Sequence, residues 1–257
     1  MGQGRDQLDY PTSVLVTATK DLIICDRDNR RIQWWPHQSI YGETLISDVA
    51  CLKLFTDHNG EIMFSTNQNE LFKWNPAENR TDLVMEAAGK NPPKSSSNMF
   101  LSRNGNIYVA DAENNRILKY RPGQDDADIV AGGQAWQSSD LNHLNKPKSV
   151  IVDDKGTLYI ADEGNNRIVR WRSGDTQGVI LSHQSYTSVL NFDRNGNLFS
   201  ASFNHVERCD IDTSACGKFL NVSEARMHSS KPPTFEYAVL AGDKIEALLP
   251  ENVPTIG

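Results

Sequence analysis

The sequence lacks any long apolar run and any strong excess of positive charge. Nowhere in its 257 residues does an apolar stretch approach the roughly 18 residues that a membrane-spanning helix needs. The formal net charge of -7 gives no overall field that attracts nucleic acid. The first ten residues, MGQGRDQLDY, contain no apolar core, so we expect no secretory signal in the chain as given. These absences exclude a membrane span and disfavour nucleic acid as a partner.

Cysteine is also scarce, and the familiar catalytic motifs are missing. The four cysteines form no CxxC pair and have no histidine pair at zinc-finger spacing: Cys25, Cys51, Cys209 and Cys216. The chain contains no G-x-S-x-G motif, no P-loop and no G-x-G-x-x-G after an apolar strand. No Ser, His and Asp trio can be identified from spacing. We therefore expect no cofactor and no structural zinc.

What the sequence does contain is an internal repeat. Five copies of one apolar segment recur at spacings of about 40 to 51 residues, the range of a propeller blade: LIICD at 22–26, IMFST at 62–66, IYVAD at 107–111, LYIAD at 158–162 and LFSAS at 198–202. Another strand-like run precedes each copy, and a turn such as Asn104-Gly105 or Asn195-Gly196 separates the two. Asn-Gly favours a hairpin because both residues tolerate a positive φ. Each unit therefore begins with two antiparallel strands.

Two further strands complete most units. The third carries an aromatic residue three places after its first apolar residue, with a cysteine in this place in the fifth unit: Trp35, Trp74, Tyr120, Trp171 and Cys209. A fourth apolar run closes the units at 44–46, 83–85, 129–130 and 179–181. Four-stranded antiparallel units of this kind cannot bury their faces alone and pack radially. We predict an all-β fold, a β-propeller of four-stranded antiparallel blades.

Three units share a more specific signature, Asp-x-x-Asn-x-Arg-Ile. It supplies three Asp and Arg pairs, Asp26 and Arg31, Asp111 and Arg116, and Asp162 and Arg167. These units resemble the NHL repeat family of β-propellers, and the resemblance covers about residues 10–219. The other two units depart from the pattern, with Thr66 and Glu70 near the Asp and Arg places in the second and Ser202 and His205 in the fifth.

The length and the resemblance both imply a six-bladed propeller with five blades readable, as a single domain over 1–257. The blades span about 11–48, 49–88, 98–133, 147–182 and 186–221, with a degenerate or partial last blade at 222–257. Residues 236–243 echo the fourth-strand segment 128–133, so they end either a sixth blade or a five-bladed closure with a long insertion. Residues 2–11 look like a link between blades, which suggests that the chain was cut within a longer array.

The recurring Asp and Arg invite a catalytic or metal-binding interpretation, but a structural one is stronger. An Asp that ends one strand and an Arg that begins the next lie across a tight turn. There the carboxylate accepts turn N–H groups and pairs with the guanidinium. We expect Asp26, Arg31, Asp111, Arg116, Asp162 and Arg167 to support their hairpins, and the aromatic residues to pack between blades.

A recognition site is expected where the longest loops gather. In such a blade the turn between the second and third strands projects on the same face as the link to the next blade. The two longest links, 89–98 and 134–146, therefore share one rim. The second offers Trp136, Asp140, Asn142 and His143 on a flexible loop over a rigid scaffold, with a plain surface loop as the alternative. We predict that this rim binds a protein or peptide and that truncating 134–146 spares the fold.

An enzyme is the alternative to a binding scaffold. Similar propellers include lyases and lactonases, and the chain resembles peptidyl-hydroxyglycine amidating lyase locally, where a His precedes the Lys-Pro that opens a strand, as His143 precedes Pro147. A catalytic zinc needs about three converging ligands, yet the equivalent stretches offer Gln7 and His183 without a clear third His. We therefore favour a non-enzymatic scaffold over a metal-dependent lyase or hydrolase, and expect no bound metal.

The cysteines lie where cross-links can form. Cys25 falls near the end of one second strand and Cys51 at the start of the next first strand, which puts them on the same face of neighbouring strands. Cys209 and Cys216 face each other across a predicted hairpin. Disulfides require an oxidising compartment, and two glycosylation sequons, 79–81 and 221–223, point the same way. We favour an extracellular or secreted glycoprotein, with buried thiols as the alternative at Cys25 and Cys51.

Overall fold

A computed structural model describes residues 2–57, 59–86, 92–94, 96–133, 138–183, 189–193, 196–202, 205–211 and 215–221. Within these ranges the chain forms five antiparallel sheets, each of four strands in sequence order. The predicted all-β propeller of four-stranded blades is confirmed. No helix in the described ranges is long and apolar enough to cross a membrane.

The blades follow one another along the chain. Blade one comprises β1 (Pro11–Val16), β2 (Leu22–Asp26), β3 (Arg31–Trp35) and β4 (Glu43–Ser47). Blade two comprises β5 (Cys51–Thr56), β6 (Ile62–Thr66), β7 (Glu70–Asn75) and β8 (Arg80–Glu86). Blade three comprises β9 (Ser96–Leu101), β10 (Ile107–Asp111), β11 (Arg116–Tyr120) and β12 (Asp128–Gly132).

The remaining two blades repeat this order. Blade four comprises β13 (Pro147–Val152), β14 (Leu158–Asp162), β15 (Arg167–Trp171) and β16 (Val179–His183). Blade five comprises β17 (Val189–Phe192), β18 (Leu198–Ala201), β19 (His205–Asp210) and β20 (Ala215–Asn221). Two single-turn 3₁₀ helices, η1 (Ala112–Asn114) and η2 (Glu163–Asn165), join the second and third strands of blades three and four.

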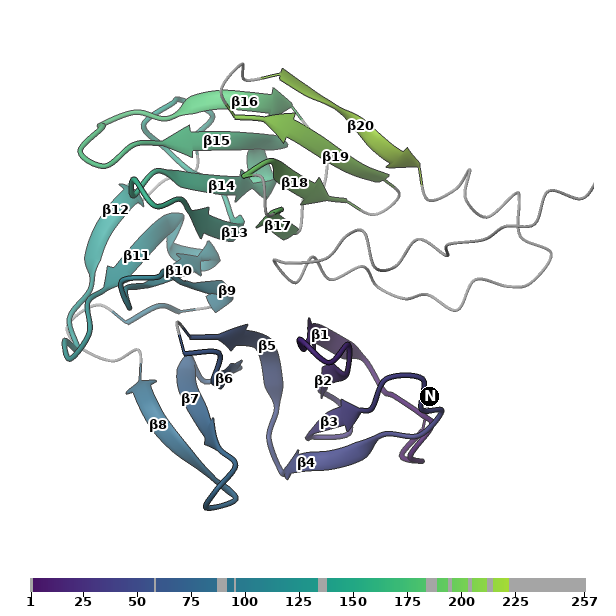
Figure 1. Ribbon diagram of the computed structural model, residues 1–257. Coiled ribbons are helices and arrows are strands. Elements are labelled where there is room, and N and C mark those ends of the chain that lie inside the picture. Colours follow the sequence, from purple (N-terminus) through teal and green to yellow (C-terminus); the bar gives the residue numbers. More distant parts are fainter. Residues whose placement is uncertain are drawn as a thin grey trace, which may run out of the picture.

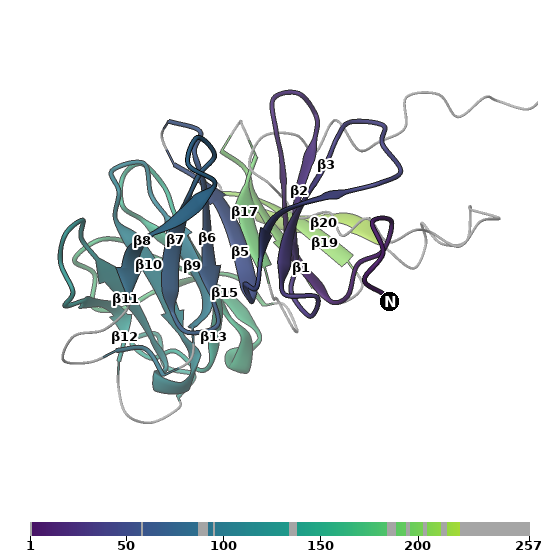
Figure 2. The ribbon, with the colours of Figure 1, turned by 90° about the horizontal axis from the view of Figure 1, so that it is seen from below.

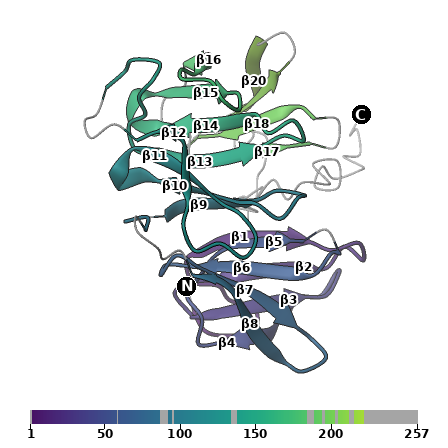
Figure 3. The same cartoon turned by 90° about the vertical axis from the view of Figure 1, so that its left-hand side faces the viewer.

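The five blades are arranged in an arc around a common axis. Figure 1 shows the first strand of each blade toward the centre and the fourth at the perimeter, with blades one and five at the two ends of the arc. The N-terminal end lies beside blade one in Figures 1 and 2, and blades three and four stand side by side in Figure 3. The predicted last blade, 222–257, lies outside the described residues.

The turns between first and second strands explain the recurring glycines. Gly156 has a φ of 79°, and Gly105 has the same value. A Cβ built at Gly156 would meet no atom within 4 Å, so the backbone conformation rather than space requires glycine there. In the blade-three turn, Ser102 N–H donates to Asn106 O at 2.9 Å, which closes the hairpin. The hairpins therefore form where the Asn-Gly and Lys-Gly pairs predict them.

The hydrophobic core lies between blades rather than inside them. Side chains alternate between the two faces of each strand, so Tyr108 and Ile117 of blade three pack with Val150, Ile160 and Trp171 of blade four. The neighbouring interface uses the opposite face of blade three, where Tyr120 packs against blade two. Tyr120 and Trp171 are 1% and 3% exposed, as expected for inter-blade packing. Each blade is therefore stabilised by its neighbours.

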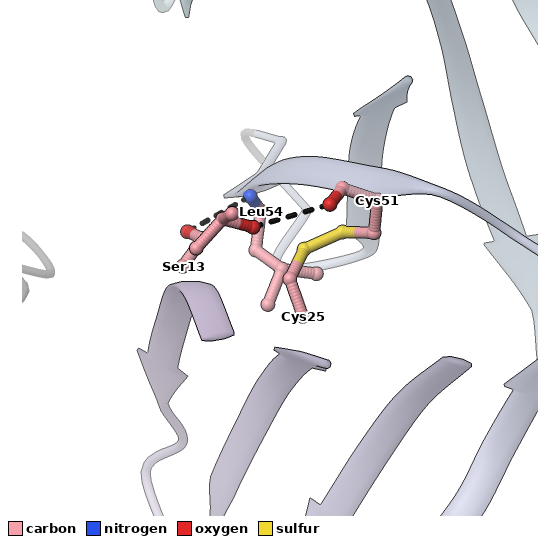
Figure 4. The surroundings of a disulfide bond; sticks show 5 residues. Ser13, Cys25, Cys51 and Leu54 are labelled. Atoms are coloured by element: carbon pink, nitrogen blue, oxygen red, sulfur yellow. Dashed lines mark hydrogen bonds between the residues drawn. A yellow bond between two sulfur atoms is a disulfide. The ribbon is translucent and has the colours of Figure 1, made fainter. Parts of the chain in front are cut away.

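A disulfide joins blades one and two. Cys25 of β2 is bonded to Cys51 of β5, with a Cα–Cα distance of 5.4 Å, and both residues are fully buried. Figure 4 shows the bond beside the hydrogen bond between Ser13 and Leu54, which joins the same two blades. The predicted pairing of Cys25 and Cys51 is confirmed.

We expect replacement of both Cys25 and Cys51 by Ala to lower the free energy of unfolding by about 2 to 4 kcal/mol. The bond closes a loop with a sequence separation of 26, and the unfolded chain gains freedom without it. Urea unfolding of the oxidised wild type and the double variant measures the effect. A loss under about 0.5 kcal/mol would contradict it. Labelling of the unreduced, denatured wild type should modify neither residue.

The second cysteine pair also follows the predicted register. Cys209 of β19 lies directly opposite Cys216 of β20 in the strand pairing, and Cys209 is fully buried and disulfide-bonded. Cys209 occupies the place of the aromatic residue in the other blades and packs in the interface between blades four and five. Of the two predicted sequons, Asn79 lies in an exposed turn before β8, and Asn221 is the last residue of β20.

Candidate functional site

Each complete Asp-x-x-Asn-x-Arg motif forms the same buried cluster. The Arg Nε lies 2.6 Å from the Asp Oδ2 in blade one, 2.8 Å in blade three and 2.7 Å in blade four. The Asn of the motif donates to the same oxygen at 2.9, 2.7 and 2.8 Å in these three blades. All three carboxylates are fully buried: Asp26, Asp111 and Asp162. We call this arrangement the Asp–Arg clamp; the predicted Asp and Arg pairing is present in every copy.

The clamp also holds the link that leads into its blade. The second oxygen of Asp162 accepts the N–H of Asn145 at 2.6 Å, and Asp26 accepts that of Asp9 in the same way at 2.6 Å. The terminal nitrogens of Arg167 donate to link carbonyls, at 2.5 Å to Ser139, 3.1 Å to Asp140 and 2.9 Å to His143. A guanidinium with its donors in a planar fork suits this task, because it binds a carboxylate and carbonyls at once. The clamp therefore ties link, turn and blade together.

The links into blades one and four make equivalent contacts residue by residue. Arg31 donates to the carbonyls of Gln3, Gly4 and Gln7, as Arg167 does to those of Ser139, Asp140 and His143. Gly42 N–H donates to Arg5 O at 2.7 Å, and Gly178 N–H to Leu141 O at 2.8 Å. Tyr10 and Lys146, which end the two links, both have a φ of 48°. Residues 3–10 and 139–146 are therefore copies of one structural unit.

The link into blade four is anchored, contrary to the predicted flexible loop. Leu144 is 1% exposed and belongs to the core between blades three and four. His143 is 7% exposed, and its Nδ1 lies 2.7 Å from Asn142 Oδ1. The prediction that truncating 134–146 spares the fold remains untested, but we now expect the truncation to destabilise blade four, because it removes the core contact of Leu144 and the carbonyls that Arg167 binds. The sequence signal that could have indicated this anchoring was Leu144, an apolar residue within an otherwise polar link.

The predicted binding residues fall into three groups. Asp140 and Asn142 are exposed, and Leu141 between them is 38% exposed. His143 is buried beneath them, so it supports the segment rather than facing solvent. Trp136 lies outside the described residues. The surface offered by this link is therefore Asp140, Leu141 and Asn142, held from below by Arg167 and Leu144.

Burial controls the electrostatics of the blade-four clamp. Burial raises the pKa of the Asp162 carboxyl, against the opposing effects of the Asn145 N–H, Asn165 and Arg167. A buried ion pair costs desolvation energy for both partners, so the clamp depends on all of its hydrogen bonds being made. Blade two avoids this cost, because Thr66 Oγ1 donates to Glu70 Oε2 at 2.7 Å where blades one, three and four have Asp and Arg.

The link geometry bears on the metal-dependent alternative. Gln7, Pro92 and His143 occupy equivalent places, since each supplies the carbonyl that its clamp arginine binds. A metal site that used one His from the equivalent position of each blade is therefore not possible in blades one and three, which have Gln7 and Pro92 there. In the part of the chain that the structure describes, no three His, Cys, Asp or Glu side chains form a group that could hold a metal ion. The His183 side chain lies at the exposed end of β16.

The inner strands carry a feature that sequence reasoning missed. Four equivalent places on β1, β5, β9 and β13, defined by the strand pairing, hold polar residues: Ser13, Lys53, Asn98 and Ser149. Ser13 Oγ accepts the Leu54 N–H at 3.1 Å, and Ser149 Oγ accepts the Leu190 N–H at 3.3 Å, so each serine joins its blade to the next. Lys53 Nζ instead donates to Asn98 Oδ1 at 2.8 Å. We call these four residues the inner polar belt.

The opposite face has a groove that the sequence did not predict. It has a volume of about 610 Å³ and lies among the turns between first and second strands of blades three, four and five. Phe100, Tyr108 and Phe192 line its apolar part. Arg103 and Asp154 join two of the turns through an ion pair of 2.8 Å, in which both side chains are largely exposed. Such an exposed pair contributes little to stability.

Comparison with known proteins defines the class. The chain is similar in structure to a chain of a nidogen/laminin complex, with 15% identity over 84% of this chain and 82% of that one and a TM-score of 0.64. A gluconolactonase from Xanthomonas campestris gives 16% identity over 84% and 77% of the two chains and a TM-score of 0.64. Virginiamycin B lyase from Staphylococcus aureus gives 16% over 85% and 72% and a TM-score of 0.56. The protein is a β-propeller.

The repeat itself is identified as well. Residues 144–171, which run from Leu144 of the link to the end of β15, match the NHL repeat. The resemblance drawn from the Asp-x-x-Asn-x-Arg signature is thereby confirmed in blade four. The structural neighbours include both enzymes and a protein-binding propeller, so the fold alone fits either function.

Proposed function

We propose that this propeller is a non-enzymatic scaffold that binds a protein or peptide through one rim. We call this face the link rim; it carries the links at 2–10, 92–94 and 138–146 and the turns after β2, β10 and β14. The observation that carries the proposal is the clamped link of blade four, which presents Asp140, Leu141 and Asn142 on a fixed backbone. Recognition residues of many proteins stand in this way on loops over a rigid scaffold.

Fixing the link before binding favours affinity. A loop that is already ordered loses less conformational freedom when a partner docks, so more of the contact energy appears as binding. Arg167 and Leu144 order the segment from below, while the exposed residues combine a charge, an apolar side chain and an amide. Such a mixed surface suits a polypeptide partner better than the uniform phosphate charge of a nucleic acid.

The chemistry of the rim favours binding over catalysis. The His143 imidazole lies in the protein interior, and glutamine and proline stand at the equivalent places in blades one and three. The protein-binding neighbour, from a nidogen/laminin complex, supports a scaffold role by analogy of fold. The disulfide and the exposed Asn79 support an oxidising, extracellular setting, which belongs to the same proposal.

The test replaces the exposed residues without touching the clamp. A randomised peptide library is selected on the purified protein, and calorimetry gives the Kd of an enriched peptide. We expect the triple variant Asp140→Ala, Leu141→Ser and Asn142→Ala to raise that Kd by about tenfold or more. Its Tm should fall by no more than about 3 °C, because all three side chains are exposed, while the buried His143 loses the Asn142 oxygen that lies 2.7 Å from its Nδ1.

The matched control lies on the opposite face. The double variant Arg103→Ala and Asp154→Ala removes an exposed ion pair at the groove and should leave the Kd unchanged. If the control weakens binding and the triple variant does not, the link rim is not the binding face. Metal-dependent hydrolysis of gluconolactone by the purified protein would instead support the lyase or hydrolase alternative.

A further inference from the structure

Lys53 departs from the structural pattern of the inner polar belt. In blades one and four this place holds a small serine, which bonds the next blade and is 5% or less exposed. In blade two it holds a half-buried lysine, whose Nζ reaches Asn98 on the first strand of blade three. A serine would suffice to join two inner strands, so the charge of Lys53 has no evident structural purpose.

The charge of Lys53 is not compensated within the described residues. Among the described residues, its Nζ forms a hydrogen bond with the neutral Asn98 amide and no ion pair with a carboxylate. Burial lowers the pKa of Lys53 to about 8, with no neighbouring charge contributing to the shift. A partly desolvated ammonium without an anion costs free energy. An anionic ligand would remove that cost.

The neighbouring amide supplies a second donor. Lysine only donates, so Asn98 must turn its Oδ1 toward Nζ. Its Nδ2 then stands beside the ammonium, and the two groups present N–H donors from adjacent blades. A carboxylate, with two oxygens that only accept, complements this pair better than a neutral or cationic group.

The position of the pair connects it with the link rim. Cys51 begins β5 and pairs with Thr66, which stands in the clamp place of blade two. Lys53 pairs with Ser65, the residue before Thr66, so it lies at the link-rim end of the inner strand. Since β5 and β9 are the first strands of their blades, the pair lies on the two strands nearest the propeller axis (Figure 1), where its contact joins blades two and three.

We propose that Lys53 and Asn98 form a carboxylate-binding site beside the propeller axis, at the link-rim end, which anchors the C-terminal or side-chain carboxylate of a bound peptide. The site rests on the proposed peptide-binding function and assigns the chemistry of one end of the ligand. The ammonium supplies the charge, and the Asn98 amide fixes the orientation of the carboxylate. The ring of Phe55, 5.6 Å from Nζ, borders the ammonium on its own strand.

The experiment uses three defined probes and follows Lys53 directly. The full chain is reductively methylated with ¹³C, and the Lys53 resonance is assigned by its absence from Lys53→Met. An acetylated tripeptide with a free C-terminus, its C-terminal amide, and that amide with a Glu side chain are titrated in turn. We expect both carboxylate probes, and not the plain amide, to shift the Lys53 resonance and raise its pKa. Acetate as a fourth probe separates a free small carboxylate from a peptide-borne one.

Two variants separate binding from structure. Lys53→Met should abolish carboxylate binding and raise Tm by about 2 to 4 °C, because an uncompensated charge is removed. Lys53→Arg should retain part of the binding, since it keeps the charge. Lys148→Met, an exposed lysine on the first strand of blade four, should leave binding and Tm unchanged.

The outcomes also distinguish this site from the proposed function. A lowered Tm for Lys53→Met, with carboxylate binding intact, would show that Lys53 only joins blades two and three. Equal weakening by Lys53→Met and Lys148→Met would show attraction by overall charge and overturn the site. If library peptides depend on Asp140 and Asn142 but not on Lys53, the site fails while the binding function stands. If carboxylates bind at Lys53 while the link-rim variants bind library peptides normally, the carboxylate site stands and the proposed binding through the link rim fails.

Discussion

Arg167→Ala is expected to lower the free energy of unfolding by about 3 to 5 kcal/mol. The substitution leaves the buried Asp162 carboxylate without its cation, since Arg167 Nε is its partner at 2.7 Å. It also removes the donors that hold the carbonyls of Ser139, Asp140 and His143. Arg167 itself is 2% exposed, so water cannot replace these donors without opening the blade. Urea unfolding of the purified variant measures the loss.

Two further substitutions make this result specific. Arg172→Ala removes an exposed arginine from the same blade and should change stability by less than about 0.5 kcal/mol. Arg167→Lys keeps the charge but loses the planar fork, so it should fall between Arg167→Ala and the wild type. If Arg167→Ala abolishes peptide binding at unchanged thermal stability, the Asp and Arg residues are the binding surface, and their assignment to the scaffold is wrong.

The fold could be predicted because its signals are local and repeated. Asn104-Gly105 fixes a hairpin by itself, and the apolar runs on both sides fix which faces are buried. Repetition then identifies the propeller, since four-stranded units of this length bury their faces only against each other. The Cys25 and Cys51 pairing could be predicted for a related reason. Both positions follow from strand ends within the repeat.

The clamp could be predicted only in part. The Asp and Arg stand across one turn, so their pairing follows from sequence distance alone. The hydrogen bonds from Arg167 to the link carbonyls could not be predicted, because every residue has a backbone carbonyl and the residue types of a link do not show which ones accept a bond. Residues 3–10 and 139–146 share one identical residue, Leu8 and Leu144, and each segment is followed by a Pro, yet their backbones make the same hydrogen bonds. The link was therefore mistaken for a flexible loop.

The Lys53 site was missed for a different reason. Its place on the first strand is occupied by serine in two blades and by asparagine in another, so it looks like an ordinary polar position in an alternating strand. Only the pairing of β5 with β6 and the contact with Asn98 show that it lies between blades. Departures from a repeat become visible when its members are compared in space.

Leu144→Ala should lower the free energy of unfolding by about 2 to 5 kcal/mol, because it opens a cavity in a closed interface. Leu144 is 1% exposed and packs between blades three and four. It lies so close to Gly132 that a Cβ added there would be 3.1 Å from the Leu144 side chain. The loss is measured by urea unfolding, alongside the exposed double variant Asp140→Ala and Leu141→Ser, which should be nearly neutral. A cost near zero for Leu144→Ala would show that the link contributes nothing to the core.

Leu8→Ala is the matched comparison, since Leu8 occupies the equivalent place in the link of blade one. Leu8 is only half-buried. The link of blade four packs between blade four and the blade before it, so the equivalent link of blade one lies on the side of that blade that faces away from blade two. Less apolar area is then lost on truncation, so the cost should be at most about 1 kcal/mol. The difference between the two variants measures the contribution of a preceding blade. If Leu8→Ala proves as costly as Leu144→Ala, blade one is covered on this side in solution, as a closed six-bladed ring requires.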